Sequence, residues 1–557
     1  MITSHYVRYL VALASCVPLA MSTAQTTAWN DTGTNFNLAG SWSSGLPDVS
    51  TVAQFPVDGA IGFQPTLTSS ISVLGLDFQG VGYTVGGTGT LTVGASGVTS
   101  AGSGTNTIGA ALATVASSSQ TWNIGTSSTL AVTGALTAGS GSTVVKTGAG
   151  TLTLNGTSGA LATTLDIQGG VVKASTKYLA SSFALSNAAE LQIGFTGVTS
   201  NVNGTMTLGS GGGIISQVPA SGNSTRLDFT FAGSGDLELR GNTTASRFMQ
   251  LNQGSSLNAS TNSGSTSITS GTVRLSGGYA LGDSSIVSVN SGAELQIRNS
   301  ETVGGLKGAG TVSAVAGSTG SVNNIFTLNS STTNVFSGLL KDDPANSGNT
   351  LGITKNGAGV QTFSGANTYS GGTTVTAGTL LITNTSGSGT GTGAVTVNGG
   401  TFGGTGAASG NVTVATGAAL QAGDGASASG ALTLSGDVSL GTGSVIKLTL
   451  GDSGQHSTLA RTGGVWAFAS GQQFTLTSIG AGIGFYDDVI TGLSSALDAS
   501  LWTITNAGYV GTFSFDENNN VDLTIFAVPE PTTWAYLGMA FFACFALFFR
   551  RRKQSDL

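Results

Sequence analysis

The sequence predicts an all-β protein, built as a solenoid of stacked parallel strands with a β cap at each end and a single C-terminal transmembrane helix. Short strands in which apolar residues alternate with Thr or Ser recur along the chain, and Gly, at 88 of 557 residues, separates them. Similar strands also recur at a nearly constant step of about twenty residues. Such a step is typical of a solenoid, in which one turn can bury its apolar face only against its neighbours.

Four pairs of strand residues define the step. Two pairs are 22 positions apart, Leu130 with Leu152 and Val273 with Leu295. The other two are 39 positions apart, Leu91 with Leu130 and Leu152 with Leu191. The longer spacing is close to two turns. Because stacked strands lie about 4.8 Å apart, roughly twenty turns predict a rod on the order of 100 Å long.

The composition excludes several classes of protein. Charged residues make up 8% of the chain and the net charge is −7, which argues against nucleic-acid binding and against a globular enzyme of ordinary composition. Hydrophobic residues make up 39% and alternate with polar ones, which favours a folded chain over a disordered one. Cys16 and Cys544 lie near the two ends, so residues 25–527 hold no disulfide, thiolate metal site or thiol nucleophile. We expect no cofactor.

The N-terminus has the pattern of a secretory signal peptide over residues 1–24. His5 and Arg8 flank a polar start, Tyr9–Ala20 is apolar, and small residues lead to a predicted cleavage between Ala24 and Gln25. The Sec translocon is therefore the expected partner. Cys16 offers an alternative, because Leu-Ala-Ser-Cys resembles a lipoprotein signal. Either reading predicts an exported chain.

Three regions follow the signal peptide. Residues 25–60 are predicted to form an N-terminal cap, because Trp29 and other aromatic residues gather there and terminal turns must hide open strand edges. Residues 61–424 carry the repeating strands of the solenoid. Residues 425–527 bring a burst of aromatic residues and are predicted to form a C-terminal β cap.

Residues 528–557 form a membrane-arrest tail. Pro529, Glu530 and Pro531 precede the uncharged stretch Trp534–Phe549, and a basic cluster follows: Arg550, Arg551, Arg552 and Lys553. A helix of this length spans roughly 24 Å, slightly short of a bilayer core. The positive-inside rule places the basic cluster in the cytoplasm and the preceding chain outside. A permanent single-span anchor is one interpretation.

The order of these three parts resembles the PEP-CTERM sorting domain of bacterial exported proteins. That resemblance implies recognition and cleavage of the tail by a membrane transpeptidase of the exosortase type. The protein would then pass from an intermediate anchored in the inner membrane to the cell envelope, cell surface or extracellular matrix.

Residues 352–382 resemble the autotransporter-associated β-strand repeat, with Lys-Asn-Gly-Ala-Gly before one strand and Ala-Gly-Thr-Leu-Leu-Ile at the end. Residues 146–172 resemble it in part, with a clear first half and a degenerate second half. This repeat is associated with right-handed parallel β-helices. We expect the chain to correspond to the secreted passenger part of such proteins, with the sorting tail where their transport domain would follow.

Two motifs are weak candidates for chemistry. Asp516, Asn518, Asn520 and Asp522 have the oxygen spacing of a calcium loop, but Val521 stands where Gly is wanted and alternating strands flank the segment. A hairpin turn is the favoured explanation, and weak calcium binding is the alternative. His456 lies beside Gly-Asp-Ser-Gly at residues 451–454, but no second histidine lies between the signal peptide and the tail to complete a protease triad.

Residues 226–307 hold much of the charge. Arg240, Arg274 and Arg298 alternate with acidic residues and with buried-type aliphatics, so we expect charges on the outer face of successive turns. A solvated face with ion pairs between turns, a glycan-binding face, and the arginine base of a polysaccharide lyase all fit this pattern. The leading expectation is a non-enzymatic, adhesin-like structural protein, with exopolysaccharide as a further candidate partner. The alternative is a carbohydrate-active β-helix protein that binds or cleaves polysaccharide.

Overall fold

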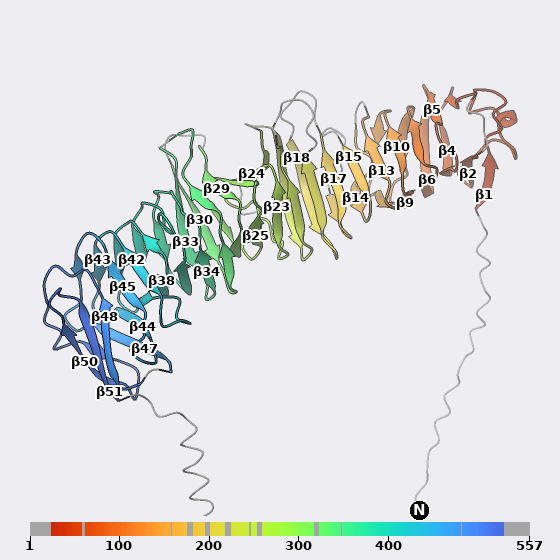
Figure 1. Ribbon diagram of the computed structural model, residues 1–557. Helices are drawn as coiled ribbons and strands as arrows, with labels where there is room; N and C mark the ends of the chain where they lie inside the picture. Colours follow the sequence, from red (N-terminus) through yellow and green to blue (C-terminus); the bar gives the residue numbers. More distant parts are fainter. Residues whose placement is uncertain are drawn as a thin grey trace, which may run out of the picture.

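The structure is a computed structural model of the 557-residue chain, and it describes residues 24–57, 62–156, 159–174, 182–194, 201–217, 224–243, 247–252, 259–316, 322–346, 348–480 and 482–527. The chain forms an elongated body in which strands stack side by side from the red N-terminal end to the blue C-terminal end (Figure 1). Parallel strands make up about 17 turns of a β-solenoid. The all-β, parallel solenoid class is therefore confirmed, with somewhat fewer turns than the twenty expected.

Four sheets run along the solenoid, numbered here from the N-terminus. Sheet 1 covers the first part of the rod and contains β1 (Gln25–Ala28), β2 (Thr51–Phe55), β4 (Ile71–Phe78), β6 (Thr90–Ser100), β8 (Ala111–Thr114), β9 (Ser119–Ile124), β11 (Leu136–Thr137), β12 (Thr143–Thr147), β14 (Thr164–Ile167), β16 (Ser182–Leu185), β18 (Asn201–Leu208), β20 (Thr225–Gly233), β22 (Met249–Asn252), β24 (Thr272–Ser276), β26 (Glu294–Arg298), β29 (Thr311–Ala314) and β32 (Leu339–Lys341).

Sheet 2 extends along most of the rod and contains β3 (Thr66–Leu67), β5 (Thr84–Gly87), β7 (Gly104–Ile108), β10 (Ser128–Val132), β13 (Thr151–Leu154), β15 (Val171–Ala174), β17 (Ala189–Ile193), β19 (Gly213–Gln217), β21 (Leu237–Arg240), β23 (Thr266–Ser270), β25 (Ile286–Val289), β28 (Gly305–Gly308), β31 (Asn334–Phe336), β34 (Val360–Phe363), β36 (Thr379–Ile382), β38 (Thr401–Gly404), β41 (Ala419–Ala422), β44 (Val445–Gly451), β47 (Gln473–Ile479) and β49 (Thr503–Ile504).

Sheet 3 belongs to the second part of the rod and contains β27 (Glu301–Val303), β30 (Asn323–Asn329), β33 (Thr350–Asn356), β35 (Thr373–Val375), β37 (Val395–Val397), β40 (Val412–Val414), β43 (Val438–Leu440) and β46 (Trp466–Ala467). Sheet 4 closes the C-terminal end and contains β39 (Ala407–Ala408), β42 (Ala431–Leu434), β45 (Thr458–Arg461), β48 (Gly484–Ile490), β51 (Val521–Ala527) and β50 (Val510–Phe515).

An aliphatic ladder forms the core of sheet 2. Eight residues that pair in register from turn to turn are fully buried: Leu130, Leu152, Val172, Leu191, Ile215, Leu239, Ile268 and Val289. Each turn contributes one rung, so the buried area of any rung depends on the turns before and after it. The stacking also satisfies the backbone N–H and C=O groups of the inner strands.

The register tests the step expected from the sequence. Leu130 pairs directly with Leu152, and Val273 with Leu295, so the 22-residue spacing is one turn. Leu152 reaches Leu191 through Val172, so that 39-residue spacing is two turns.

The same spacing from Leu91 to Leu130 has another origin. Leu91 lies in sheet 1 and pairs with Leu112, whereas Leu130 lies in sheet 2 and pairs with Asn106. Its interpretation as two turns on one face was wrong, because two sheets carry the same alternating pattern and spacing alone does not distinguish them.

Aromatic residues cover the N-terminal turns. Trp42 packs edge-on against Trp29 and Phe36, with ring centroids 5.2 and 4.8 Å away, and it also contacts Phe55. The Trp42 indole N–H donates to the Phe36 carbonyl at 2.9 Å, so the buried ring keeps a polar partner. The same segment contributes β1 and β2, which already stack in parallel.

The C-terminal end changes its pairing mode. Parallel stacking continues past residue 424 through β41, β44, β47 and β49. In sheet 4, β51 then pairs antiparallel with both β48 and β50. These strands lie at the tip of the blue end in Figure 1.

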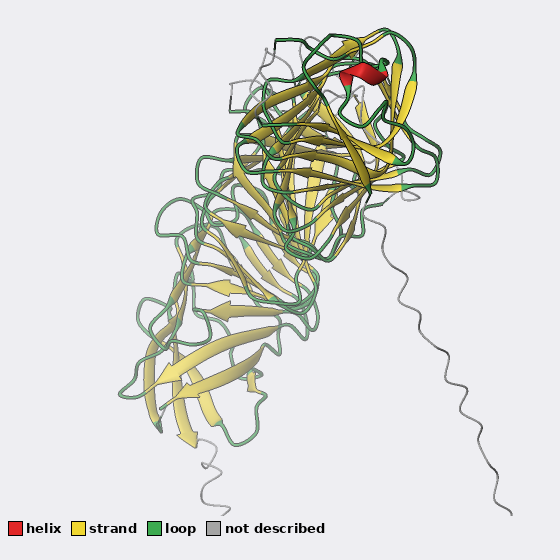
Figure 2. Cartoon of the chain, turned by 90° about the vertical axis from the view of Figure 1, so that its right-hand side faces the viewer, coloured by secondary structure: helices red, strands yellow, loops and turns green. Residues whose placement is uncertain are grey.

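Helix is rare in the part of the chain that the structure describes. It holds the 3-10 turn η1 (Ala39–Ser41), drawn red in Figure 2, and within these ranges no helix is long and apolar enough to cross a bilayer. The signal peptide up to Thr23 and the whole tail from residue 528, including the expected helix Trp534–Phe549, lie outside the described residues. Both remain predictions.

Candidate functional site

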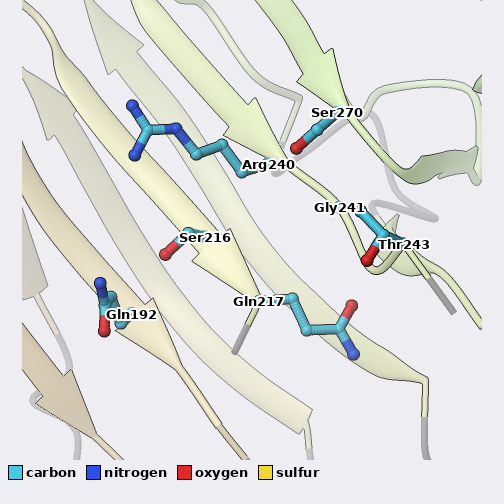
Figure 3. Close-up of a pocket in the computed structure, with 7 residues that line it drawn as sticks. All are labelled: Gln192, Ser216, Gln217, Arg240, Gly241, Thr243 and Ser270. Carbon is cyan, nitrogen blue, oxygen red and sulfur yellow. The ribbon is translucent and has the colours of Figure 1, made fainter. Parts of the chain in front are cut away.

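A hollow of about 290 Å³ lies at the C-terminal ends of β17, β19, β21 and β23 in sheet 2. Its lining residues are Gln192, Ser216, Gln217, Arg240, Gly241, Thr243 and Ser270. Figure 3 shows them coming from successive turns, with the Arg240 side chain extended across the sheet. The hollow places amide, hydroxyl and guanidinium groups at the spacing of stacked strands, which suits hydrogen bonding to an extended polar ligand.

Arg240 is held by two carboxylates. Its Nε donates to Glu238 Oε1 at 2.7 Å, and its Nη1 lies 3.7 Å from Glu190 Oε2 on an earlier turn. Burial raises the pKa of Glu238, but hydrogen bonds from Arg240 and Thr269 outweigh it and lower that pKa below its usual value. The hydrogen bond to Glu238 likewise raises the pKa of Arg240. The contact with Glu190 is an ion pair between turns, whereas the shorter contact with Glu238 lies within β21.

Arg274 and Arg298 lie on a different sheet from Arg240. Arg274 is in β24 and Arg298 ends β26, both in sheet 1, whereas Arg240 ends β21 in sheet 2. The Arg274 guanidinium stacks 3.6 Å above the Phe248 ring and donates twice to Gln296 Oε1. Burial, and then the charge of Arg298, lower its pKa to about 10. The three arginines therefore do not meet in one site.

The motif at residues 516–522 is a hairpin turn between β50 and β51. The Asp516 carboxylate accepts the backbone N–H groups of Asn518 and Asn520, at 2.9 and 2.7 Å, and the Asn518 side-chain amide at 3.1 Å. Asp522 turns instead toward Asp487 and Asp488 of β48, with carboxylate oxygens within 4.8 Å of one another. Burial, and the neighbouring Asp487, raise the pKa of Asp522 despite a hydrogen bond from the Asp488 N–H. These four motif residues thus do not surround one point.

His456 lies in the turn after β44. Its Nδ1 is 3.2 Å from the Ser457 carbonyl and 3.4 Å from Thr458 Oγ1. The ring packs edge-on near Tyr486 at 6.5 Å. Its contacts are those of a side chain that fixes a turn.

Two lysines that the sequence analysis did not single out lie inside the solenoid. Lys146 lies in an inward-facing column between Trp122 and Ile167, and Lys355 lies in another between Leu328 and Val375. Both side chains are fully buried in apolar columns.

Each buried lysine holds a corner together through backbone carbonyls. Lys146 Nζ donates to Thr147, Gly148 and, one turn later, Gly169, at 2.9, 2.7 and 2.9 Å. Lys355 Nζ donates to Asn356 and Gly357 and, one turn later, Ala377, at 2.7, 2.7 and 3.3 Å. We call this arrangement the lysine clamp. All three ammonium protons are used, and burial lowers the pKa of both lysines to about 8.

A Lys-x-Gly-x-Gly signal precedes the strand in both places, at residues 146–150 and 355–359. This shared motif was the signal in the sequence that could have identified the two buried lysines. It was missed because a lysine normally indicates a solvated position.

Both clamps fall within the segments that resemble a known family. The family model of the passenger-associated-transport-repeat matches residues 144–174 and 353–382. These are the two places where the sequence resembled the autotransporter-associated repeat, so that expectation is confirmed at the level of the repeat. No curated protein matches the chain. The repeat and the solenoid together fit a secreted, passenger-type structural protein of the adhesin kind, consistent with an exported or surface location.

Proposed function

We propose that this protein is a non-enzymatic, exported rod of the cell surface or extracellular matrix that works by shape and adhesion. The observation that carries the proposal is the buried ladder of sheet 2, which links turn after turn into a stiff body with passenger-type repeats. Its outer faces repeat Thr, Ser and Asn side chains along the axis, so weak contacts can add up over a long surface.

The C-terminal tail suggests how the protein is exported and sorted. We propose export by the Sec translocon, arrest in the inner membrane by Trp534–Phe549, and cleavage near Pro529–Pro531 by an exosortase-type transpeptidase. Support comes from the order of motif, apolar stretch and basic cluster. The released protein would then join the cell envelope, surface or matrix.

The intact mass of the protein outside the membrane tests this route. We expect a species that has lost residues 1–24 and the basic cluster Arg550–Lys553. Replacing both Pro529 and Pro531 with Ala should keep the tail attached and the protein in the membrane fraction, whereas the control Pro344→Ala should not. A released species that still carries the basic cluster would contradict cleavage.

Glycan binding without turnover is a second candidate function, favoured by the amide, hydroxyl and guanidinium groups that line the hollow around Arg240. Arg240 lies on sheet 2 and Arg298 on sheet 1, so variants at these two positions test the faces of the two sheets separately. Retention on a panel of acidic polysaccharides should weaken with Arg240→Ala and stay unchanged with Arg298→Ala. Equal loss with both variants would argue for charge alone, and release of unsaturated sugar products would favour a lyase.

A further inference from the structure

Large apolar side chains are exposed around the point where the described chain ends. Ile483 is 68% exposed, Val510 57%, and Phe485 and Phe526 53% each. Three of them lie in β48, β50 and β51, and Ile483 directly precedes β48; these strands form the antiparallel part of sheet 4, at the tip of the molecule (Figure 1). Exposed aromatic and branched residues in a cluster mark a surface that meets something apolar.

The strand register places these four residues together. Gly484 pairs with Ile525, so Ile483 comes opposite Phe526, and Phe485 pairs with Thr524 on the same face. On the other side of β51, Val510 pairs with Ala527 and Gly511 with Ile525, which leaves Phe526 as the extra residue of a bulge. A bulge redirects a side chain. We call Ile483, Phe485, Val510 and Phe526 the exit patch.

The exit patch lies at the end of β51, where the described chain ends. Ala527 ends β51, and only residues 528–533 separate it from the apolar stretch that begins at Trp534. Seven steps along a chain, even fully extended, cover at most about 25 Å. If that stretch lies in a bilayer, the exit patch is tethered within this distance of the lipid surface, at an effective concentration on the order of millimolar.

We propose that the exit patch rests on the outer lipid surface of the membrane while the tail is attached. We call this contact the membrane seat. It depends on the tail anchor proposed above, and it determines how the rod is oriented on the membrane before release. Phe485 and Phe526 enter the interface, where aromatic side chains are favoured. Asp487 follows Phe485 by two residues on β48 and is exposed. Its charge favours uncharged headgroups over anionic ones.

Single-cysteine labelling of the full chain tests the seat, because residues 24–527 contain no cysteine. The chain is reconstituted in phosphatidylcholine vesicles that contain spin-labelled lipid, which quenches a nearby fluorophore. One form carries Cys16→Ser and is labelled at Cys544, to report the tail. A second carries Cys16→Ser, Cys544→Ser and Thr524→Cys, to report the patch. A third has Thr413→Cys in place of Thr524→Cys, to report an exposed site on β40.

We expect quenching at positions 544 and 524 and little at position 413. Replacing Phe485 and Phe526 together with Ser removes both aromatic side chains of the patch, so quenching at 524 should fall by roughly threefold or more. The matched replacement of Val49 and Val335, which are similarly exposed, should leave it unchanged.

The two labels separate failure of the seat from failure of the anchor. Quenching at 544 without quenching at 524 would overturn the membrane seat alone. No quenching at 544 would overturn the anchor and the tether with it. In the absence of lipid, the label at 544 could instead be shielded from a water-soluble quencher. If the Phe485 and Phe526 replacements remove that shielding, the tail itself covers the patch, and the membrane seat is wrong.

Discussion

A lysine inside an apolar column is costly unless every proton finds an acceptor. Lys146 and Lys355 meet that condition with carbonyls from two adjacent turns, so each clamp fixes both a corner and the register between turns. The same corner geometry appears in the two segments that match the passenger-associated-transport-repeat. The lysine in the two matched segments therefore has a physical role, which is to fix the corner of the turn.

Lys355→Met tests the clamp. Methionine fills the column but leaves the Asn356, Gly357 and Ala377 carbonyls without their donor. We expect a loss of about 1–3 kcal/mol in the free energy of unfolding, measured by chemical denaturation. The exposed Lys307 provides the control, because Lys307→Met should change stability by no more than about 0.5 kcal/mol.

Glu301 is a buried acid that makes stability depend on pH. Its carboxylate accepts the N–H groups of Ala280 and Leu281, at 3.3 and 3.1 Å, yet burial raises its pKa to about 8. Between the ordinary value near 4.5 and about 8, the folded state binds more protons than the unfolded state. Stability therefore falls as pH rises through this window. Glu301→Gln should flatten that fall, as measured by unfolding between pH 4.5 and 8, and an unchanged slope would contradict it.

At the scale of the element, glycine sets where a turn can pack against the next. Gly378 has a φ of +66°, and a Cβ there would lie 2.3 Å from the Gly357 carbonyl oxygen and 2.8 Å from Lys355 Nζ. Gly170 holds the equivalent place after the first clamp, with a φ of +64°. These glycines are required by both conformation and space, unlike many glycines in the chain.

Gly378→Ala and Gly417→Ala separate the two requirements. Gly417 has a φ of +79° but open space around its Cβ position. We expect about 1 kcal/mol of destabilisation at Gly417 from backbone strain alone. At Gly378 the added clash should raise the loss to roughly 2 kcal/mol or more. Equal losses in denaturation experiments would contradict the close approach at the clamp.

The elements also show what the sequence could predict. Alternation correctly placed residues such as Leu152 and Leu295 in strands, which the structure shows as β13 and β26, because a period of two follows directly from strand geometry. It did not assign strands to sheets, as Leu91 and Leu130 show. It also did not foresee that Arg240 would lie apart from Arg274, because a parallel turn carries several outward faces and the corners between them have variable lengths.

At the scale of the whole molecule, the solenoid distributes its stability along its length. Each turn contacts its neighbours, so stability is close to a sum over turns and interfaces, and damage stays local. A globular core would instead unfold as one unit. This difference suits a surface rod, which can lose one turn and keep its two ends folded.

Leu191→Asp tests that property. Leu191 is fully buried between Val172 and Ile215, so a carboxylate there should cost roughly 4 kcal/mol or more in local stability. Limited proteolysis should then cut near β17 and leave two resistant fragments, one on each side. Gln192→Asp, on the outward side of the same strand, should leave the protein uncut at this position. Complete digestion of the Leu191 variant would indicate one cooperative unit and would contradict the independence of the turns.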